Sequence, residues 1–178
     1  ARLRCGPLGF VDAAIDFVCF DPADAAGADE ALAGRCDQYV FISSATVYRK
    51  PHRLPVHEDD PRGNPVSPYA ERKRRTEDWL LARGERLPVT VVRPSHTICD
   101  GYLPSPMHGG DFTIAARIRA GRPILVHDSG RSLWAVTAAE DLAVGLVGLL
   151  GQTDCLGQCY HITTDQVTTW RGIYHEIG

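Results

Sequence analysis

The amino-acid sequence predicts an α/β fold built on a parallel sheet, and three segments near its start carry that prediction. Residues 13–20 (AAIDFVCF) and 38–44 (QYVFISS) are short, nearly continuous apolar runs, the pattern of a parallel strand covered on both faces. The alanine-rich segment between them, 23–35, favours a helix despite its glycine. Strand, helix and strand of this length form a βαβ unit, which implies parallel strands joined by a right-handed crossover.

The rest of the chain continues this alternation. Ser67 suits the N-cap, and Pro68 the first position, of a helix predicted over 68–84. A strand at 87–95 follows. The later predicted elements are a glycine- and proline-rich loop at 100–111, helices at 112–121, 138–150 and 168–178, and strands at 123–127 and 159–163.

The composition limits the classes of function. The chain has 178 residues, 44% of them hydrophobic, and a formal net charge of −3, which suits one globular domain with a proper core. It lacks the basic excess of general nucleic-acid or membrane-surface binding proteins. The longest apolar run, 142–150, is too short to span a bilayer, and we find no secretory signal. The six cysteines contain no CxxC pair and indicate free thiols, so we expect a cytoplasmic protein.

Polar residues follow two of the predicted strands. Ser43 and Ser44 end one strand, and Pro94, Ser95 and His96 end the next. Ligands of open α/β sheets bind outside the carboxyl ends of the strands. These residues therefore lie where chemistry is expected.

Tyr69 and Lys73 are four residues apart in the predicted helix 68–84, so their side chains share one face. This YxxxK pair alone is weak evidence, since many helices contain one. The basic run 72–75 shares its helix with the acidic residues Glu71, Glu77 and Asp78, and we interpret it as part of a solvated face around Lys73. His52, His57, Asp59 and Asp60 precede the helix, but their spacing fits no metal motif, and we predict no metal site.

Three sequence segments, taken together, make the YxxxK pair stronger evidence of a catalytic site. FISSATVY (41–48), EDDPRGNPVSPYAERKRRTE (58–77) and PVTVVRPS (88–95) resemble the extended short-chain dehydrogenase/reductase family, which contains nucleotide-sugar epimerases and dehydratases. Ser44 precedes Tyr69 by 25 residues, which is similar to the spacing of the catalytic serine and tyrosine in sugar epimerases. The resemblance covers residues 11–100 well and the remainder more loosely. It implies a Rossmann-like parallel sheet flanked by helices in a partial dinucleotide-binding domain, 1–100, and a small C-terminal substrate-binding portion, 101–178.

The resemblance implies a catalytic set of Ser44, Tyr69 and Lys73. Tyr69 would be the general acid/base, Lys73 would lower its pKa and bind the nicotinamide ribose, and Ser44 would orient the reacting oxygen. A free tyrosine has a pKa of about 10, so action near pH 7 requires roughly three units, or about 4 kcal/mol. An ammonium about 4 Å away supplies on the order of 4 kcal/mol at an effective dielectric of about 20.

The resemblance also implies a cofactor, NAD or NADP, a small-molecule substrate and a homodimer packed through the YxxxK helix, with no nucleic acid and no membrane as partners. The residues expected to contact the cofactor are Phe20, Ser43, Tyr69, Lys73 and Pro94, and those expected to contact substrate are Ser44, Thr46, His96 and Trp134. The expected reaction is hydride transfer at a hydroxyl-bearing carbon of a sugar-like or secondary-metabolite substrate, as oxidoreduction or within an epimerase or dehydratase cycle.

Two features depart from the family pattern. The glycine-rich turn that binds the cofactor pyrophosphate is not found, and GPLG at 6–9 is the only candidate. We therefore expect the chain to begin near the fourth strand of the usual sheet, as part of a longer enzyme. The alternative is a short relative without nicotinamide binding, acting as a cofactor-free cyclase or isomerase or as a non-catalytic binding protein. The second departure is the uncharged segment around Trp134, where family members often place a basic residue against a nucleotide diphosphate.

Overall fold

The computed structural model describes residues 9–50, 53–105 and 112–178. The chain divides into two compact units. The first comprises the chain up to Pro94 together with Leu146–Ile162, and the second comprises Ser95–Gly145 and Thr163–Gly178. The expected functional division at residue 100 remains a prediction.

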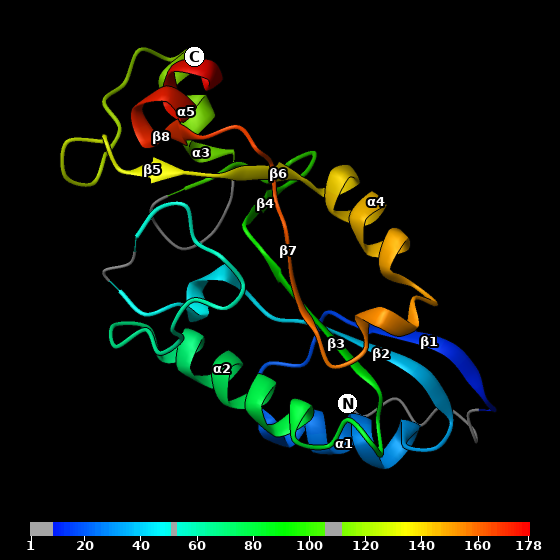
Figure 1. Ribbon diagram of the computed structural model, residues 1–178. Helices are drawn as coiled ribbons and strands as arrows, with labels where there is room; N and C mark the ends of the chain where they lie inside the picture. The colour runs from blue at the N-terminus through cyan, green and yellow to red at the C-terminus, as the bar shows by residue number, and fades with distance from the viewer. Residues whose placement is uncertain (1–8, 51–52, 106–111) are drawn as a thin grey trace. The chain divides into compact units, whose positions relative to one another are not determined.

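The first unit contains a four-stranded parallel sheet (Figure 1). Its strands are β1 (Val11–Asp16), β2 (Cys36–Ile42), β3 (Val89–Pro94) and β7 (Cys159–Ile162), in the order β1-β2-β3-β7. All three pairings are parallel, as the apolar runs predicted. The α/β class and the parallel sheet flanked by helices are therefore confirmed.

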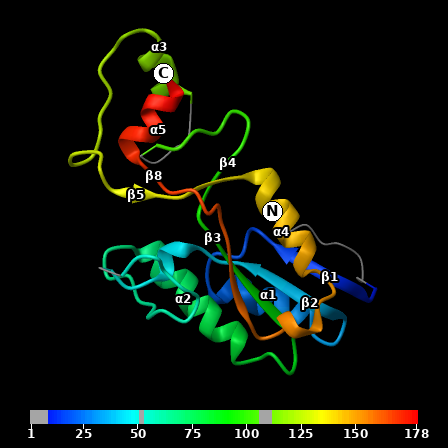
Figure 2. The same ribbon diagram turned by 45° about the horizontal axis from the view of Figure 1, so that its top comes forward.

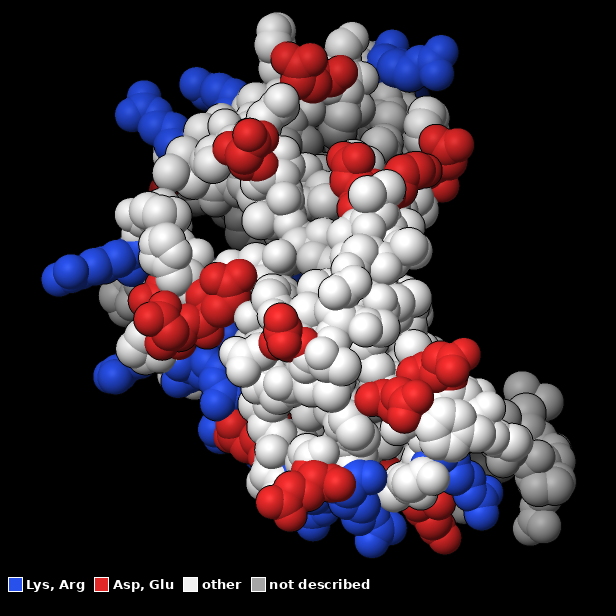
Figure 3. All heavy atoms as spheres, turned by 45° about the vertical axis from the view of Figure 1, so that its right-hand side comes forward, with Lys and Arg blue, Asp and Glu red and all other residues white. Residues whose placement is uncertain are grey.

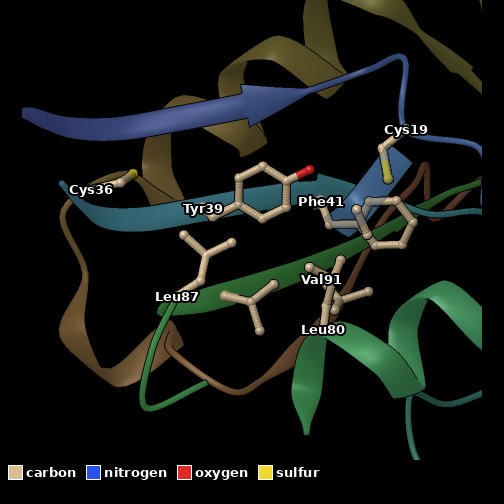
Figure 4. Close-up of a cluster of buried hydrophobic side chains, with 9 residues drawn as sticks. Cys19, Cys36, Tyr39, Phe41, Leu80, Leu87 and Val91 are labelled. Atoms are coloured by element: carbon tan, nitrogen blue, oxygen red, sulfur yellow. The ribbon is translucent and has the colours of Figure 1, made fainter. Parts of the chain in front are cut away.

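Two helices cover one face of this sheet, α1 (Pro22–Leu32) and α2 (Pro68–Leu81). Ser67 caps α2 as predicted, since its hydroxyl accepts a hydrogen bond from the Ala70 amide at 3.2 Å. The core between helices and sheet is shown in Figure 4; its buried members are Cys19, Ala25, Cys36, Tyr39, Phe41, Leu80, Leu87, Val89 and Val91. Fully burying a side chain such as Leu80 contributes about 1.5–3 kcal/mol.

The opposite face of β2 carries a buried amide. The Gln38 amide nitrogen donates to the Thr90 hydroxyl and to the Leu149 carbonyl, both at 3.0 Å, and the Gly151 amide donates to the Gln38 carbonyl at 2.9 Å. Leu149 is the last residue of helix α4 (Ala139–Leu149), and the short helix η2 (Thr153–Cys155) follows. These bonds attach the end of α4 to the sheet.

The second unit contains two small sheets (Figure 2). Strand β4 (His96–Ile98) pairs in parallel with β6 (Val136–Ala138), and β5 (Leu133–Trp134) pairs antiparallel with β8 (Thr168–Thr169). Helices α3 (Thr113–Arg119) and α5 (Trp170–Ile177) complete it. Its core has Trp170, Ile173 and Tyr174 at the centre, with Trp134 packed against them.

The structure corrects several expected boundaries. The predicted strand 123–127 is irregular, because Leu125 and Val126 point into solvent and only Ile124 packs against the second core. The first strand ends at Asp16 instead of residue 20, because the Asp16 carboxylate accepts hydrogen bonds from the amides of Val18 and Cys19 and turns the chain.

In the part of the chain that the structure describes, we find no helix long and apolar enough to cross a membrane. The five described cysteines are free thiols, and of these Cys99 is exposed.

Candidate active site

Ser44 is the second residue after β2, at the carboxyl end of the parallel sheet. Its side chain caps the short helix η1 (Ala45–Val47) by accepting a hydrogen bond from the Thr46 amide at 3.2 Å. The exposed Thr46 hydroxyl also donates to it, at 2.9 Å. Since the Ser44 oxygen accepts both bonds, its own proton remains for a further acceptor.

Lys73 is the most enclosed member of the expected catalytic set, with 2% of its surface exposed. Its ammonium donates to the carbonyl of Cys19 at 2.6 Å and to that of Ile42 at 2.7 Å. Cys19 lies in the turn after β1 and Ile42 is the last residue of β2, so the cation bridges the ends of two neighbouring strands. It also lies 4.9 Å from the ring centroids of both Phe20 and Phe41. Burial lowers the pKa of Lys73, against the opposing effect of nearby acidic groups including Asp16.

Tyr69 lies one helical turn before Lys73 and remains 36% exposed. The Lys73 ammonium is 5.9 Å from the centroid of the Tyr69 ring. Burial raises the pKa of Tyr69, while hydrogen bonding with Ser44 and the charge of Arg72 act in the opposite direction. Tyr69 and Ser44 are therefore adjacent. The pKa shift is opposite to the lowering expected from the sequence, and it keeps the phenol protonated.

Ser43 faces away from this group, into a buried polar network that the sequence reasoning missed. Its hydroxyl donates a short hydrogen bond to Glu77, a residue of α2 that is fully buried. Arg93 of β3 approaches the same carboxylate with two donors, Nε to Oε1 at 3.0 Å and Nη2 to Oε2 at 2.8 Å. Burial alone would lower the pKa of Arg93, but the bonds and charge of Glu77 outweigh it and raise it. Glu77 was expected on a solvated helix face, and that expectation is wrong.

The network continues to the preceding loop and to β7. Arg93 Nη1 donates to the Tyr48 hydroxyl at 2.7 Å and to the Glu58 carbonyl at 2.8 Å. The Tyr48 hydroxyl also forms a hydrogen bond with His161 Nε2, 2.5 Å away. Arg62 is a third partner of the Glu77 carboxylate, at 2.7 Å. Charged groups of α2, of β3 and of the loop that contains Arg62 therefore hold the end of β2 in place, next to Ser44.

The intervals between the buried residues of α2 indicate that Glu77 lies on the inward face of the helix. The buried residues of this helix are Ala70, Lys73, Thr76, Glu77 and Leu80, which recur at intervals of three and four. Glu77 is four residues after Lys73 and so falls on the same inward face. Its charge nevertheless predicted an exposed side chain, because buried carboxylates are rare unless they are paired.

The first unit brings together most of the expected site residues. Tyr69 interacts with Ser44, and the Lys73 ammonium lies near the rings of Tyr69 and of Phe20, which is 47% exposed. Pro94 is the last residue of β3 and is partly buried. His96 and Trp134 belong to the second unit, with ring centroids 6.0 Å apart. In the ranges that the structure describes, no group of three His, Cys, Asp or Glu side chains is arranged to hold a metal ion.

The chain is similar to several known proteins. Residues 27–162 match the model of the NAD dependent epimerase/dehydratase family. The chain is 30% identical over 173 residues to 2'-dehydrokanamycin reductase of Streptomyces kanamyceticus, covering 93% of this chain and 47% of that protein. It is 28% identical over 139 residues to the chloroplast stem-loop binding protein of 41 kDa b of Arabidopsis thaliana, covering 78% and 35%.

A solved structure shows the same fold. UDP-glucuronic acid 4-epimerase from Bacillus cereus, determined in complex with UDP-glucuronic acid and NAD, superposes with a TM-score of 0.74 at 19% identity, covering 88% of this chain and 49% of that one. The Rossmann-like character of the sheet is therefore confirmed. The chain spans about a third to a half of the length of these two curated relatives.

Proposed function

Because the chain belongs to the NAD-dependent epimerase/dehydratase family, we propose that it catalyses nicotinamide-dependent hydride transfer at a hydroxyl-bearing carbon of a sugar-like substrate, with Ser44, Tyr69 and Lys73 as its catalytic residues. The reaction is an oxidoreduction or the internal redox cycle of an epimerase or dehydratase. The family and its sugar-processing relatives support the sugar-related class.

The observation that carries the proposal is the environment of Lys73. A buried ammonium is costly, and here it is retained by two carbonyls at 2.6 and 2.7 Å. These bonds use two of its three protons. The third N–H is left for a ligand hydroxyl beside Tyr69. A purely structural role would be served as well by an apolar side chain, because replacing buried charges by packed apolar groups is often neutral or stabilising.

The residues of this chain fit the nicotinamide ribose end of the cofactor. Lys73 supplies a donor, the centroid of the Tyr69 ring lies 5.9 Å from its ammonium, and the partly exposed Phe20 ring lies 4.9 Å from the same ammonium. When bound, the nicotinamide supplies the acceptor or donor of the hydride. Neither the sequence nor the site favours NAD over NADP.

The proton steps fall to Tyr69 and Ser44. In oxidation Tyr69 would act as the phenolate, after its own proton has passed to solvent, and accept the proton of the substrate hydroxyl; in reduction the phenol would donate its proton to the substrate oxygen. The Ser44 hydroxyl, which keeps its own proton, donates to the same substrate oxygen and orients it. Since burial raises the Tyr69 pKa, the phenol holds its proton until a cationic group binds near it. Tyr69 would therefore ionise only during turnover.

The test is replacement of Tyr69 by Phe, assayed with NAD and NADP against sugar and nucleotide-sugar substrates. We expect at least a hundredfold loss of turnover with an unchanged unfolding temperature. Retention of full activity by the variant would remove Tyr69 from the mechanism.

A second candidate, a non-catalytic binding protein, is favoured by the similarity to the stem-loop binding protein. Against it, Arg74 pairs with Glu71 and Asp78, and Arg62 pairs with Glu77 and Asp78. Figure 3 shows basic and acidic side chains interspersed on the face it presents. Binding of RNA stem-loops that is unchanged in the Tyr69→Phe variant, together with no turnover in the parent chain, would favour this candidate. We also propose a homodimer through α2, whose outer face exposes Arg72, Arg75 and Asp78.

A further inference from the structure

Three buried polar atoms in the second unit have no hydrogen-bond partner. They are Nε2 of His96, Nε1 of Trp134 and the hydroxyl oxygen of Tyr174. Among the described residues, these are the only buried side-chain nitrogen and oxygen atoms without a partner. A buried polar group left unpaired is expensive, and the first unit pairs even the fully buried Glu77. The presence of all three unpaired atoms in the second unit therefore needs a physical explanation.

The three atoms belong to one group of rings, which we call the aromatic cluster: His96, Trp134, Trp170 and Tyr174. Trp170 lies at its centre, with ring centroids 5.1 Å from Trp134, 5.9 Å from Tyr174 and 6.2 Å from His96. The cluster is built from β4, β5 and α5, and β5 is joined to the start of α5 through its pairing with β8. On one side the exposed Tyr102 stacks on His96 with centroids 6.4 Å apart, so a ligand ring that displaces Tyr102 reaches the cluster from solvent.

The cluster carries no charge. Among the described residues, the buried charged ones are Asp29, Lys73, Glu77 and Arg93, and all four belong to the first unit. None of the buried residues of the second unit has a charged side chain. Burial lowers the pKa of His96 and raises that of Tyr174, so both are neutral near pH 7. Arg131 and Arg171, three residues from Trp134 and Tyr174, are exposed, as is His127, whose ring centroid lies 5.0 Å from that of Trp170. Arg93, three residues before His96, is buried in the first unit and paired with Glu77. A phosphate group gains little from such surroundings, because it is bound best by buried arginine or lysine.

We propose that the aromatic cluster binds an uncharged, hydroxylated ring of the substrate, a sugar or cyclitol ring without phosphate. This inference rests on the proposed function and names the substrate class of the same enzyme. Aromatic faces pack against the C–H face of such a ring, and its hydroxyls both donate and accept. They therefore satisfy Trp134 Nε1, the Tyr174 hydroxyl and His96 Nε2 together. An unsubstituted apolar ring would leave these three atoms unpaired, and the site would reject it.

Tyr174→Phe tests the inference, because it removes one unpaired hydroxyl and little else. The test uses a Trp79→Phe background, in which the two remaining tryptophans, Trp134 and Trp170, both lie in the aromatic cluster. Fluorescence is titrated with methyl glucoside, methyl galactoside, methyl mannoside and, separately, UDP. We expect at least one glycoside to change the fluorescence and UDP alone to leave it unchanged.

Tyr174→Phe should weaken that glycoside's binding about 5- to 20-fold and raise the unfolding temperature of the free protein by about 2–6 °C. A residue that is merely structural would not move these two quantities in opposite directions. The matched control is Tyr160→Phe in the first unit, where the hydroxyl interacts with Cys155. It should neither weaken glycoside binding nor raise the unfolding temperature.

Unchanged glycoside binding in Tyr174→Phe, no response to any glycoside, or a response to UDP as strong as that to the glycoside would each overturn the inference. The proposed function is judged separately, by nicotinamide-dependent turnover. Turnover without glycoside binding at the aromatic cluster would sink the inference alone, and glycoside binding without nicotinamide turnover would sink the proposed function alone.

Discussion

The fully buried carboxylate of Glu77 receives two hydrogen bonds from the guanidinium of Arg93, at 3.0 and 2.8 Å. Glu77 lies one turn after Lys73 on α2, and Arg93 is the penultimate residue of β3. The pair therefore fixes the helix that carries Tyr69 and Lys73 against the sheet. The same carboxylate accepts from Ser43, the residue before Ser44. The charged core of the first unit and the candidate active site are thus one connected structure.

Arg93→Met should strongly destabilise the chain, because it leaves the Glu77 carboxylate buried without its main partner. We expect a loss of about 3–5 kcal/mol in the free energy of unfolding, measured by urea denaturation. The double variant Arg93→Met/Glu77→Leu should lose less than Arg93→Met alone, since no buried charge is then left unpaired. A double variant at least as unstable as the single one would contradict this assignment.

Lys73→Met should abolish hydride transfer while leaving the fold intact. Methionine occupies a similar volume and carries no ammonium, so the Cys19 and Ile42 carbonyls lose their donor while the buried charge disappears. We expect turnover to fall at least about a hundredfold, the order of a general acid/base contribution, and the unfolding free energy to change by less than about 2 kcal/mol. The sequence has one other lysine, the exposed Lys50. Lys50→Met is the control and should match the parent chain in both measurements.

Replacing Ser44 should mainly lower turnover, whereas replacing Ser43 should mainly lower stability. Ser44→Ala removes the hydroxyl next to Tyr69, and we expect turnover to fall about 10- to 100-fold, with a stability cost of about 0.5–2 kcal/mol from the lost cap of η1. Ser43→Ala removes a donor to Glu77, and it should cost about 1–3 kcal/mol in stability with a smaller effect on turnover. Kinetics and denaturation of both variants check this. The reverse ranking in turnover would assign the catalytic role to Ser43.

Stability should fall on mild acidification because two partly buried histidines resist protonation. Burial lowers the pKa of His161 and of His96 in the folded chain, so the unfolded chain binds more protons as pH drops below about 6.5. The stability contributed by the neutral histidines is present above that pH and is lost as pH falls toward their lowered folded pKa values. Unfolding free energies measured between about pH 7.5 and 5 should show this decline.

His161→Gln should flatten part of that pH dependence, since it removes one of the two groups, and His96→Gln should remove another part. The exposed His175 provides the control, and His175→Gln should keep the slope of the parent chain. Equal slopes in all three variants would show that other groups cause the decline. The Glu58 carboxyl adds to acid sensitivity only at lower pH, because its pKa is lowered from an already acidic range.

The sequence was sufficient for the sheet but not for its charged interior. Continuous apolar runs predicted β1, β2 and β3, and Ser67 with Pro68 placed the start of α2, because these signals are local. Glu77 and Arg93 were missed because their pairing joins a helix to a later strand, and each charge alone indicates solvent exposure. The apolar segment 123–127 was mistaken for a strand because a pattern of apolar residues does not show whether a partner strand is available.

The central claim is that this chain forms part of a nicotinamide-dependent site, and the most direct measurement is on the natively expressed protein. The purified protein is denatured, and the released nucleotides are identified by chromatography and mass spectrometry. The account predicts NAD or NADP in near-stoichiometric amount, and a Lys73→Met variant that releases little of either. No released dinucleotide, together with no binding of NAD, NADH, NADP or NADPH by titration, would contradict it.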